Sequence, residues 1–152
     1  MTIESKLREL GLELPPAASP AFEYVPVVVH GGIAYVSGQL PKEDGEVRII
    51  GKVGADIDID AAQQAARICI LQGLSCLKAA LGTLDRIDRI LKVTGFVASA
   101  PGFTQQPRVI DAASSLLAAI LGERGRHARS AVGVIELPRG TPVEIEMIVA
   151  VK

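Results

Sequence analysis

The last quarter of the sequence holds the residue types best suited to chemistry on a small acid. Arg129 stands at the head of an apolar segment, and further on Glu144 and Glu146 alternate with apolar, mostly β-branched residues. A guanidinium can bind a carboxylate through two parallel hydrogen bonds. A glutamate on a rigid strand can orient or deprotonate a water molecule. The pattern therefore indicates a site where water attacks a small carboxylic acid.

Simpler interpretations of these residues also exist. Arg129 follows a charged loop, so it could pair with a nearby acid at the rim of the domain. Glu144 shares a strand face with Glu146, which is also typical of a solvated outer face. His127 is a candidate general base, although the sequence identifies no partner for it, and His30 is interpreted as a turn residue.

Metal, cofactor and redox chemistry have no support in the sequence. The two histidines are widely separated, and Cys69 and Cys76 fall within one predicted helix, so no metal-ligand pattern exists and no cofactor is expected. The cysteines are separated by about two helical turns, roughly 10 Å, which is too far for a disulfide. We interpret them as reduced core thiols of a cytoplasmic protein.

The composition of the chain limits which kinds of binding partner are expected. The net charge is −1, with 16 basic and 17 acidic residues mixed along the chain, which argues against nucleic-acid binding. No apolar run reaches the roughly 18 residues of a membrane span, and the N-terminus lacks a secretion signal. Hydrophobic residues make up 49% of the chain and the mean hydropathy is +0.35. This apolar excess predicts that copies of the chain cover one another.

The chain is predicted to form one domain over residues 1–152, with an N-terminal extension at 1–20 that contains a helix at 1–11 and an extended stretch enforced by Pro15, Pro16 and Pro20. The core order is β-β-α-β-α-β-β, typical of an α+β sheet with both helices on one face. The predicted elements are strands at 24–29 and 32–37, a long loop at 41–59 with a short strand at 47–50, a helix at 60–81, a strand at 87–98, a helix at 107–121, and a terminal hairpin that turns at 137–140.

Local signals set the ends of these elements. Asp60 followed by Gln63 resembles a capping box, and Gly82 ends the same helix. A tight turn at His30-Gly31 would place Tyr24 opposite Ser37, with Cβ atoms about 5 Å apart.

The terminal hairpin has a consequence for the site. If it turns at 137–140, Glu144 pairs with a residue near 135, about six residues or roughly 20 Å from Arg129. One copy of the chain then cannot bring both side chains to one small ligand. A shared site would need Arg129 from one subunit and Glu144 from the next, in agreement with the apolar excess.

Four motifs together resemble the RidA family, also called YjgF/YER057c/UK114, and the length of the chain resembles the longer-chain branch of that family. The motifs cover most of residues 20–152: Tyr24 ahead of the first hairpin, Tyr35-Val-Ser37-Gly38-Gln39-Leu-Pro, Val93-Thr-Gly-Phe-Val-Ala, and Ala128-Arg129-Ser130-Ala-Val followed by Leu137-Pro138 and Val143-Glu144-Ile-Glu146. The resemblance implies a chorismate-mutase-like fold, a homotrimer with clefts between subunits, and hydrolysis of 2-imino or enamine acids to 2-keto acids and ammonia.

The resemblance also implies roles for individual residues. Arg129 would clamp the substrate carboxylate and Glu144 would position the attacking water. Tyr24, Ser37 and Gly38 would line the same cleft.

Two residues depart from the family archetype. Ala131 stands where the archetype has cysteine, which matters little if only the backbone is needed there. Asp111 stands where the archetype has asparagine. A buried carboxylate facing a carboxylate substrate would repel it by a few kcal/mol, so the substrate could differ or the activity could be weak.

Three functions remain open at this stage. An imine or enamine deaminase that needs no cofactor is the leading interpretation, because the imine is reactive and positioning with modest base catalysis suffices. The second is a non-catalytic trimer that binds small carboxylic acids between subunits. The third is an endoribonuclease or translation inhibitor, a label that some relatives carry and that the acidic balance argues against.

Overall fold

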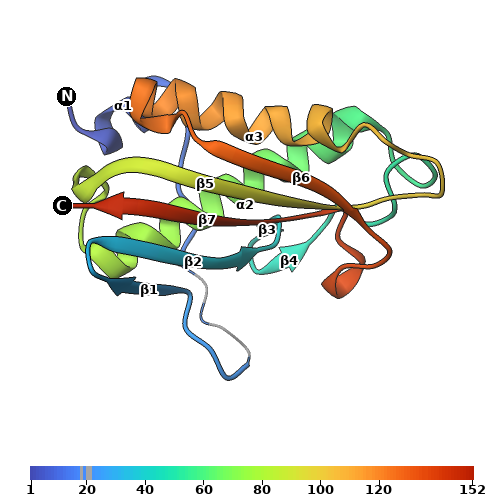
Figure 1. Cartoon of the computed structure of the whole chain (residues 1–152), viewed down its shortest axis with the longest axis horizontal. Helices are drawn as coiled ribbons and strands as arrows, with labels where there is room; N and C mark the ends of the chain where they lie inside the picture. Colours follow the sequence, from blue (N-terminus) through green and yellow to red (C-terminus); the bar gives the residue numbers. More distant parts are fainter. Residues whose placement is uncertain (18, 20–21) are drawn as a thin grey trace.

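The computed structural model describes residues 1–17, 19 and 22–152, so the predicted role of Pro20 lies outside the described residues. Seven strands and three α-helices follow one another along these residues (Figure 1). The elements are α1 (Ile3–Glu9), β1 (Val27–His30), β2 (Ile33–Gln39), β3 (Lys42–Glu43), β4 (Glu46–Val47), α2 (Ile59–Leu81), β5 (Ile87–Ala98), α3 (Gln106–Leu121), β6 (Ala128–Val134) and β7 (Val143–Val151), with short 3-10 turns at Leu84–Arg86, Gly122–Gly125 and Pro138–Gly140.

The main sheet has the strand order β1-β2-β7-β5-β6, and only β5 and β6 run parallel. Helix α2 lies behind this sheet in Figure 1 and α3 runs beside β6, so both pack on one face. The predicted α+β fold with the order β-β-α-β-α-β-β is confirmed. Strands β3 and β4 form a separate small sheet within the predicted 41–59 loop, where Asp44 and Gly45 take positive φ at the turn.

The predicted terminal hairpin is wrong, because β6 and β7 lie on opposite sides of β5 and do not pair with each other. Residues 135–142 carry the chain across the end of β5, so the longest strand of the sheet forms ladders along both edges. Arg129 pairs with Val93 and Glu144 pairs with Phe96.

The first hairpin also differs from the prediction. Its ladder runs from Val27 opposite Val36 to His30 opposite Ile33, so the turn is Gly31-Gly32. Both glycines have positive φ, as a tight hairpin turn requires, and the predicted turn would have forced His30 into that region. Ser37 therefore does not face Tyr24, and its Oγ instead donates a hydrogen bond to the carbonyl oxygen of Val25 at 2.8 Å.

Capping residues determine where α2 and α3 begin and end. Helix α2 is capped by Asp58, whose carboxylate accepts from the backbone N–H of Ala61 at 2.8 Å, so the predicted capping box at Asp60 is wrong. Gln63 instead donates to the carbonyl oxygen of Arg108. Helix α2 ends at Gly82, as predicted, and α3 ends at Gly122; both glycines have positive φ. Pro107 lies in the first turn of α3.

Helix α2 forms the centre of the core. Ile70, Leu74 and Leu77 are fully buried, and Cys69 and Cys76 are buried and free, as expected. Burial raises the pKa of the Cys69 thiol, and the charge of Glu144 raises it further. Across the described part of the chain, no helix is both long and apolar enough to cross a membrane.

Helix α1 ties the N-terminal extension to this core. Ile3 and Leu7 are buried, whereas Leu10, at the end of the helix, is exposed. The backbone N–H of Ile3 donates to Asp85 at 2.8 Å, which fixes the helix beside the turn before β5.

Candidate functional site

Glu144 lies in a cavity of about 560 Å³ at the ends of β2 and β7, here called the glutamate cavity. Four residues predicted for the site line it together: Tyr24, Ser37, Gly38 and Glu144. The remaining lining residues are Ser19, Phe22, Pro26, Gln39, Leu40, Lys42, Pro138 and Arg139. The structure thus brings the predicted tyrosine, serine and glycine to the predicted glutamate.

Gly38 allows the Glu144 carboxylate to lie against the backbone of β2. A Cβ atom at position 38 would be 2.5 Å from Oε2 of Glu144 and 2.9 Å from its Cδ, which is closer than atoms can pack. The β2–β7 ladder is also irregular between Val36 and Gln39. A bulge of this kind interrupts pairing and redirects side chains, so the backbone opens beside the carboxylate.

The surroundings of Glu144 make it a better proton acceptor than an exposed glutamate. Its pKa is raised, first by burial and then by the negative charge of Glu146. Among the described residues, no hydrogen bond or ion pair to the Glu144 carboxylate is present. A partly buried carboxylate with a raised pKa and free oxygen atoms suits general base catalysis.

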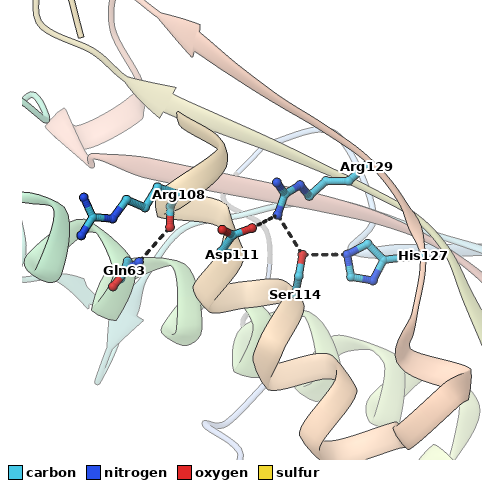
Figure 2. Close-up of polar contacts among 6 residues, drawn as sticks. All are labelled: Gln63, Arg108, Asp111, Ser114, His127 and Arg129. Atoms are coloured by element: carbon cyan, nitrogen blue, oxygen red, sulfur yellow. Dashed lines mark hydrogen bonds and ion pairs between the residues drawn. The ribbon is translucent and has the colours of Figure 1, made fainter. Parts of the chain in front are cut away.

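Arg129 lies in a second, shallower cavity of about 390 Å³, here called the arginine cavity. Figure 2 shows Arg129 of β6 meeting Asp111 and Ser114 of α3. Its Nη1 atom is 2.8 Å from Oδ1 of Asp111 and 3.2 Å from Oγ of Ser114. Arg129 therefore has an acidic partner, as the simpler interpretation of the sequence proposed.

The contacts of Arg129 leave much of its guanidinium free. Both contacts use Nη1, and within residues 1–17, 19 and 22–152 no hydrogen bond of Nη2 or Nε is present. The Arg129 side chain is 23% exposed and that of Asp111 is 63% exposed. Because Asp111 is largely solvated and paired, its repulsion of a bound carboxylate is much weaker than the few kcal/mol expected for a buried one.

His127 has a partner that the sequence did not reveal. Its Nδ1 lies 2.6 Å from the carbonyl oxygen of Gly125, and its Nε2 lies 2.9 Å from Oγ of Ser114 (Figure 2). A carbonyl oxygen can only accept, so Nδ1 of His127 carries a proton. The Ser114 hydroxyl therefore joins His127 to Arg129, because its oxygen also accepts a hydrogen bond from Nη1 of Arg129.

The two cavities do not meet within one copy of the chain. Val93 is buried under the helices and its ladder partner Arg129 contacts α3, whereas Phe96 and its partner Glu144 lie on the opposite face of the sheet. Successive strand residues alternate between faces, and positions 93 and 96 differ in parity. Ala131 is partly buried on β6 and is not among the residues lining either cavity.

Sequence reasoning missed several residues that line these cavities, among them Ser114, Lys42 and Arg139. Ser114 follows Asp111 by three positions on a helix, a spacing that places both on one face, so helical periodicity could have identified it. Lys42 and Arg139 line the glutamate cavity from two separate turns. No local pattern connects those two residues.

Comparison with known proteins identifies the family. Residues 4–141 match the family model described as "YjgF/chorismate_mutase-like, putative endoribonuclease". The match spans well over half of the chain, so the protein belongs to this family. The resemblance of its motifs to the RidA (YjgF) family is confirmed.

Close relatives share nearly the full length of the chain. Protein TCP17 of Trypanosoma cruzi is 47% identical over 148 residues, which cover 97% of this chain and 92% of that protein. The crystal structure of Atu1372 from Agrobacterium tumefaciens, described as having unknown function, is 50% identical with a TM-score of 0.92, covering 99% of this chain and 92% of that one. A Shewanella oneidensis protein described as "a putative endoribonuclease" is 32% identical with a TM-score of 0.95, covering 99% of this chain and 100% of that one.

Proposed function

We propose that the protein hydrolyses small 2-imino acids to 2-keto acids and ammonia in clefts between the subunits of a homotrimer. The observation that carries this proposal is Glu144, a carboxylate with a raised pKa and no polar partner among the described residues, held against Gly38 in a cavity. Burial and the nearby charge of Glu146 are the reasons for the raised pKa. Such a group can accept a proton from water as the water attacks an electrophilic carbon.

Association of subunits is supported by the face of the sheet opposite the helices. Val28, Tyr35 and Ile148 lie side by side there, because Tyr35 pairs with Val28 on one side and with Ile148 on the other. Val28 and Tyr35 are each about half exposed, and Val132 on β6 is 41% exposed. Contiguous apolar side chains on one sheet face are typical of a protein interface. The family is also often oligomeric.

In the proposed reaction, the free edge of Arg129 from one subunit binds the substrate carboxylate. Glu144 of the next subunit takes a proton from water while the water oxygen bonds to the C=N carbon, and it passes that proton to the imine nitrogen, which becomes an amine. Glu144 then takes the hydroxyl proton of the resulting carbinolamine and gives it to the amine nitrogen. The C=O bond forms as the C–N bond breaks and ammonia leaves, so the balance is imino acid plus water to keto acid plus ammonia.

Turnover of an imine generated in place tests the proposal. An amino-acid oxidase forms 2-iminopropanoate, and semicarbazide trapping reports how fast the imine disappears. We expect Arg129→Ala to lose nearly all acceleration. The matched control is Arg67→Ala, because Arg67 is exposed on α2 and lines neither cavity. Equal rates for the wild type and Arg129→Ala would refute the role of Arg129.

An endoribonuclease is the second candidate, because the family description and the Shewanella relative carry that name. RNA cleavage that copurifies with the protein and is lost in both Arg129→Ala and Glu144→Gln would favour it. A binding trimer without catalysis would be stabilised against heat by 2-keto acids and would release no ammonia.

A further inference from the structure

Two cations line the glutamate cavity without a carboxylate partner. Lys42 reaches it from β3 and Arg139 from the turn Pro138–Gly140. In the described part of the chain neither side chain forms an ion pair. The only hydrogen bond of the Arg139 side chain there is a long one, 3.4 Å from Nη1 to the carbonyl oxygen of Gly45.

Lys42 also influences the core beside the cavity. Its charge opposes the rise in the pKa of the Cys76 thiol of α2 that burial causes. The wall of the glutamate cavity therefore carries two cations in addition to the carboxylate of Glu144.

The backbone of Arg139 points to a functional reason for an arginine at this position. Its φ is 58° and its ψ is 16°, in the left-handed region that glycine and asparagine adopt at much lower cost. Such strain persists in proteins mainly where surrounding structure or function requires it. At this position the side chain on the left-handed backbone is a cation that lines the glutamate cavity.

We infer that this site takes dianionic 2-imino acids and their keto products, with the second carboxylate held by Lys42 and Arg139. The inference rests on the proposed function, in which Arg129 of the neighbouring subunit holds the first carboxylate. Tyr24, Pro26 and Leu40 form an apolar wall suited to the methylene groups between the two carboxylates. A cavity of about 560 Å³ also falls in the range that encloses ligands much larger than a three-carbon acid.

Binding of two keto acids of equal length tests the inference. Calorimetry on the full chain compares 2-oxoglutarate with 2-oxopentanoate, which lacks only the second carboxylate. We expect the wild type to prefer 2-oxoglutarate by about tenfold, since a charge-assisted contact is worth at least that factor. Arg139→Gly should abolish the preference without lowering the melting temperature, because glycine relieves the backbone strain.

Arg48→Ala is the matched control. Arg48 lies close to Lys42 in the sequence, pairs with Glu43 and Asp44, and is not among the residues lining the cavity. The control should keep the preference. Equal affinity of the wild type for both acids overturns the inference. Equal weakening of both acids by Arg139→Gly also overturns it, since Arg139 would then bind the carboxylate that both share. A preserved preference with no imine hydrolysis supports the dicarboxylate site and refutes the deaminase.

Discussion

Mixing two inactive variants tests whether Arg129 and Glu144 act across a subunit boundary. Arg129→Ala removes one exposed ion pair and one hydrogen bond, and exposed ion pairs of this kind contribute about 0–1 kcal/mol. Glu144→Gln keeps the size of a side chain that has no polar partner within the described residues. Both variants should therefore fold and associate, so a loss of turnover reports on chemistry.

The expected recovery follows from the closed symmetry of a trimer. Each cleft would combine the arginine of one subunit with the glutamate of the next. In a randomly mixed population of Arg129→Ala and Glu144→Gln subunits, about one quarter of the clefts receive both native residues. Coexpression of the two variants with different affinity tags, followed by tandem purification, gives the mixed trimers. Each mixed trimer has one such cleft out of three, so the turnover of the purified mixed trimers should reach about one third of the wild-type rate per cleft.

A second mixture makes the result decisive. An unselected equal mixture of wild-type subunits with the double variant Arg129→Ala/Glu144→Gln should retain about one quarter of the activity if the residues act between subunits. If both residues acted within one subunit, that mixture would retain about one half and the first mixture would stay inactive. If the first mixture had no activity, in trimers shown to contain both tags, the shared cleft would be refuted.

Two further outcomes follow from the electrostatics of the site. Burial and then Glu146 raise the pKa of Glu144 in the folded state, so ionising this carboxyl lowers the stability of the fold. The loss of stability is absent at pH values below the pKa of Glu144 in the unfolded chain. It is complete at pH values above the pKa of Glu144 in the folded protein. Glu144→Gln should therefore melt at a higher temperature than the wild type at neutral pH and at the same temperature in acid, and a constant difference across the pH range would contradict this reasoning. Asp111→Asn removes a negative charge beside Arg129 while keeping an acceptor for Nη1, so 2-oxobutanoate should bind a few-fold tighter by calorimetry, about 0.5–1 kcal/mol, with little change in stability. An unchanged or weaker affinity would show that Asp111 does not compete for the guanidinium.

The sequence predicted elements well where periodicity is local. The strand at 87–98 and the body of the helix at 60–81 match the structure closely, because alternation and an apolar helical face depend only on neighbouring residues. The start of that helix is less certain from sequence, since Asp58 and Asp60 can both cap a helix and the fold selects Asp58. The turn at Gly31-Gly32 was missed by one position although two consecutive glycines are a strong turn signal.

Contacts between distant segments could not be read from local patterns. Tyr24, Ser37, Gly38 and Glu144 could be grouped because the family resemblance connected them, and the structure gathers them in one cavity. Lys42 and Arg139 lie in turns far apart in the sequence, and nothing in either turn predicts the other.

The position of β5 explains why the proposed site still requires two subunits although the predicted hairpin is wrong. In a hairpin, Arg129 and Glu144 would be separated by distance along neighbouring strands. In the structure β5 lies between their strands, and their ladder partners Val93 and Phe96 face opposite sides of the sheet. Lateral movement of strands within one copy cannot bring such side chains together. The proposed trimer would instead bring the Arg129 guanidinium of a neighbouring subunit to Glu144, which is why the proposed function depends on association.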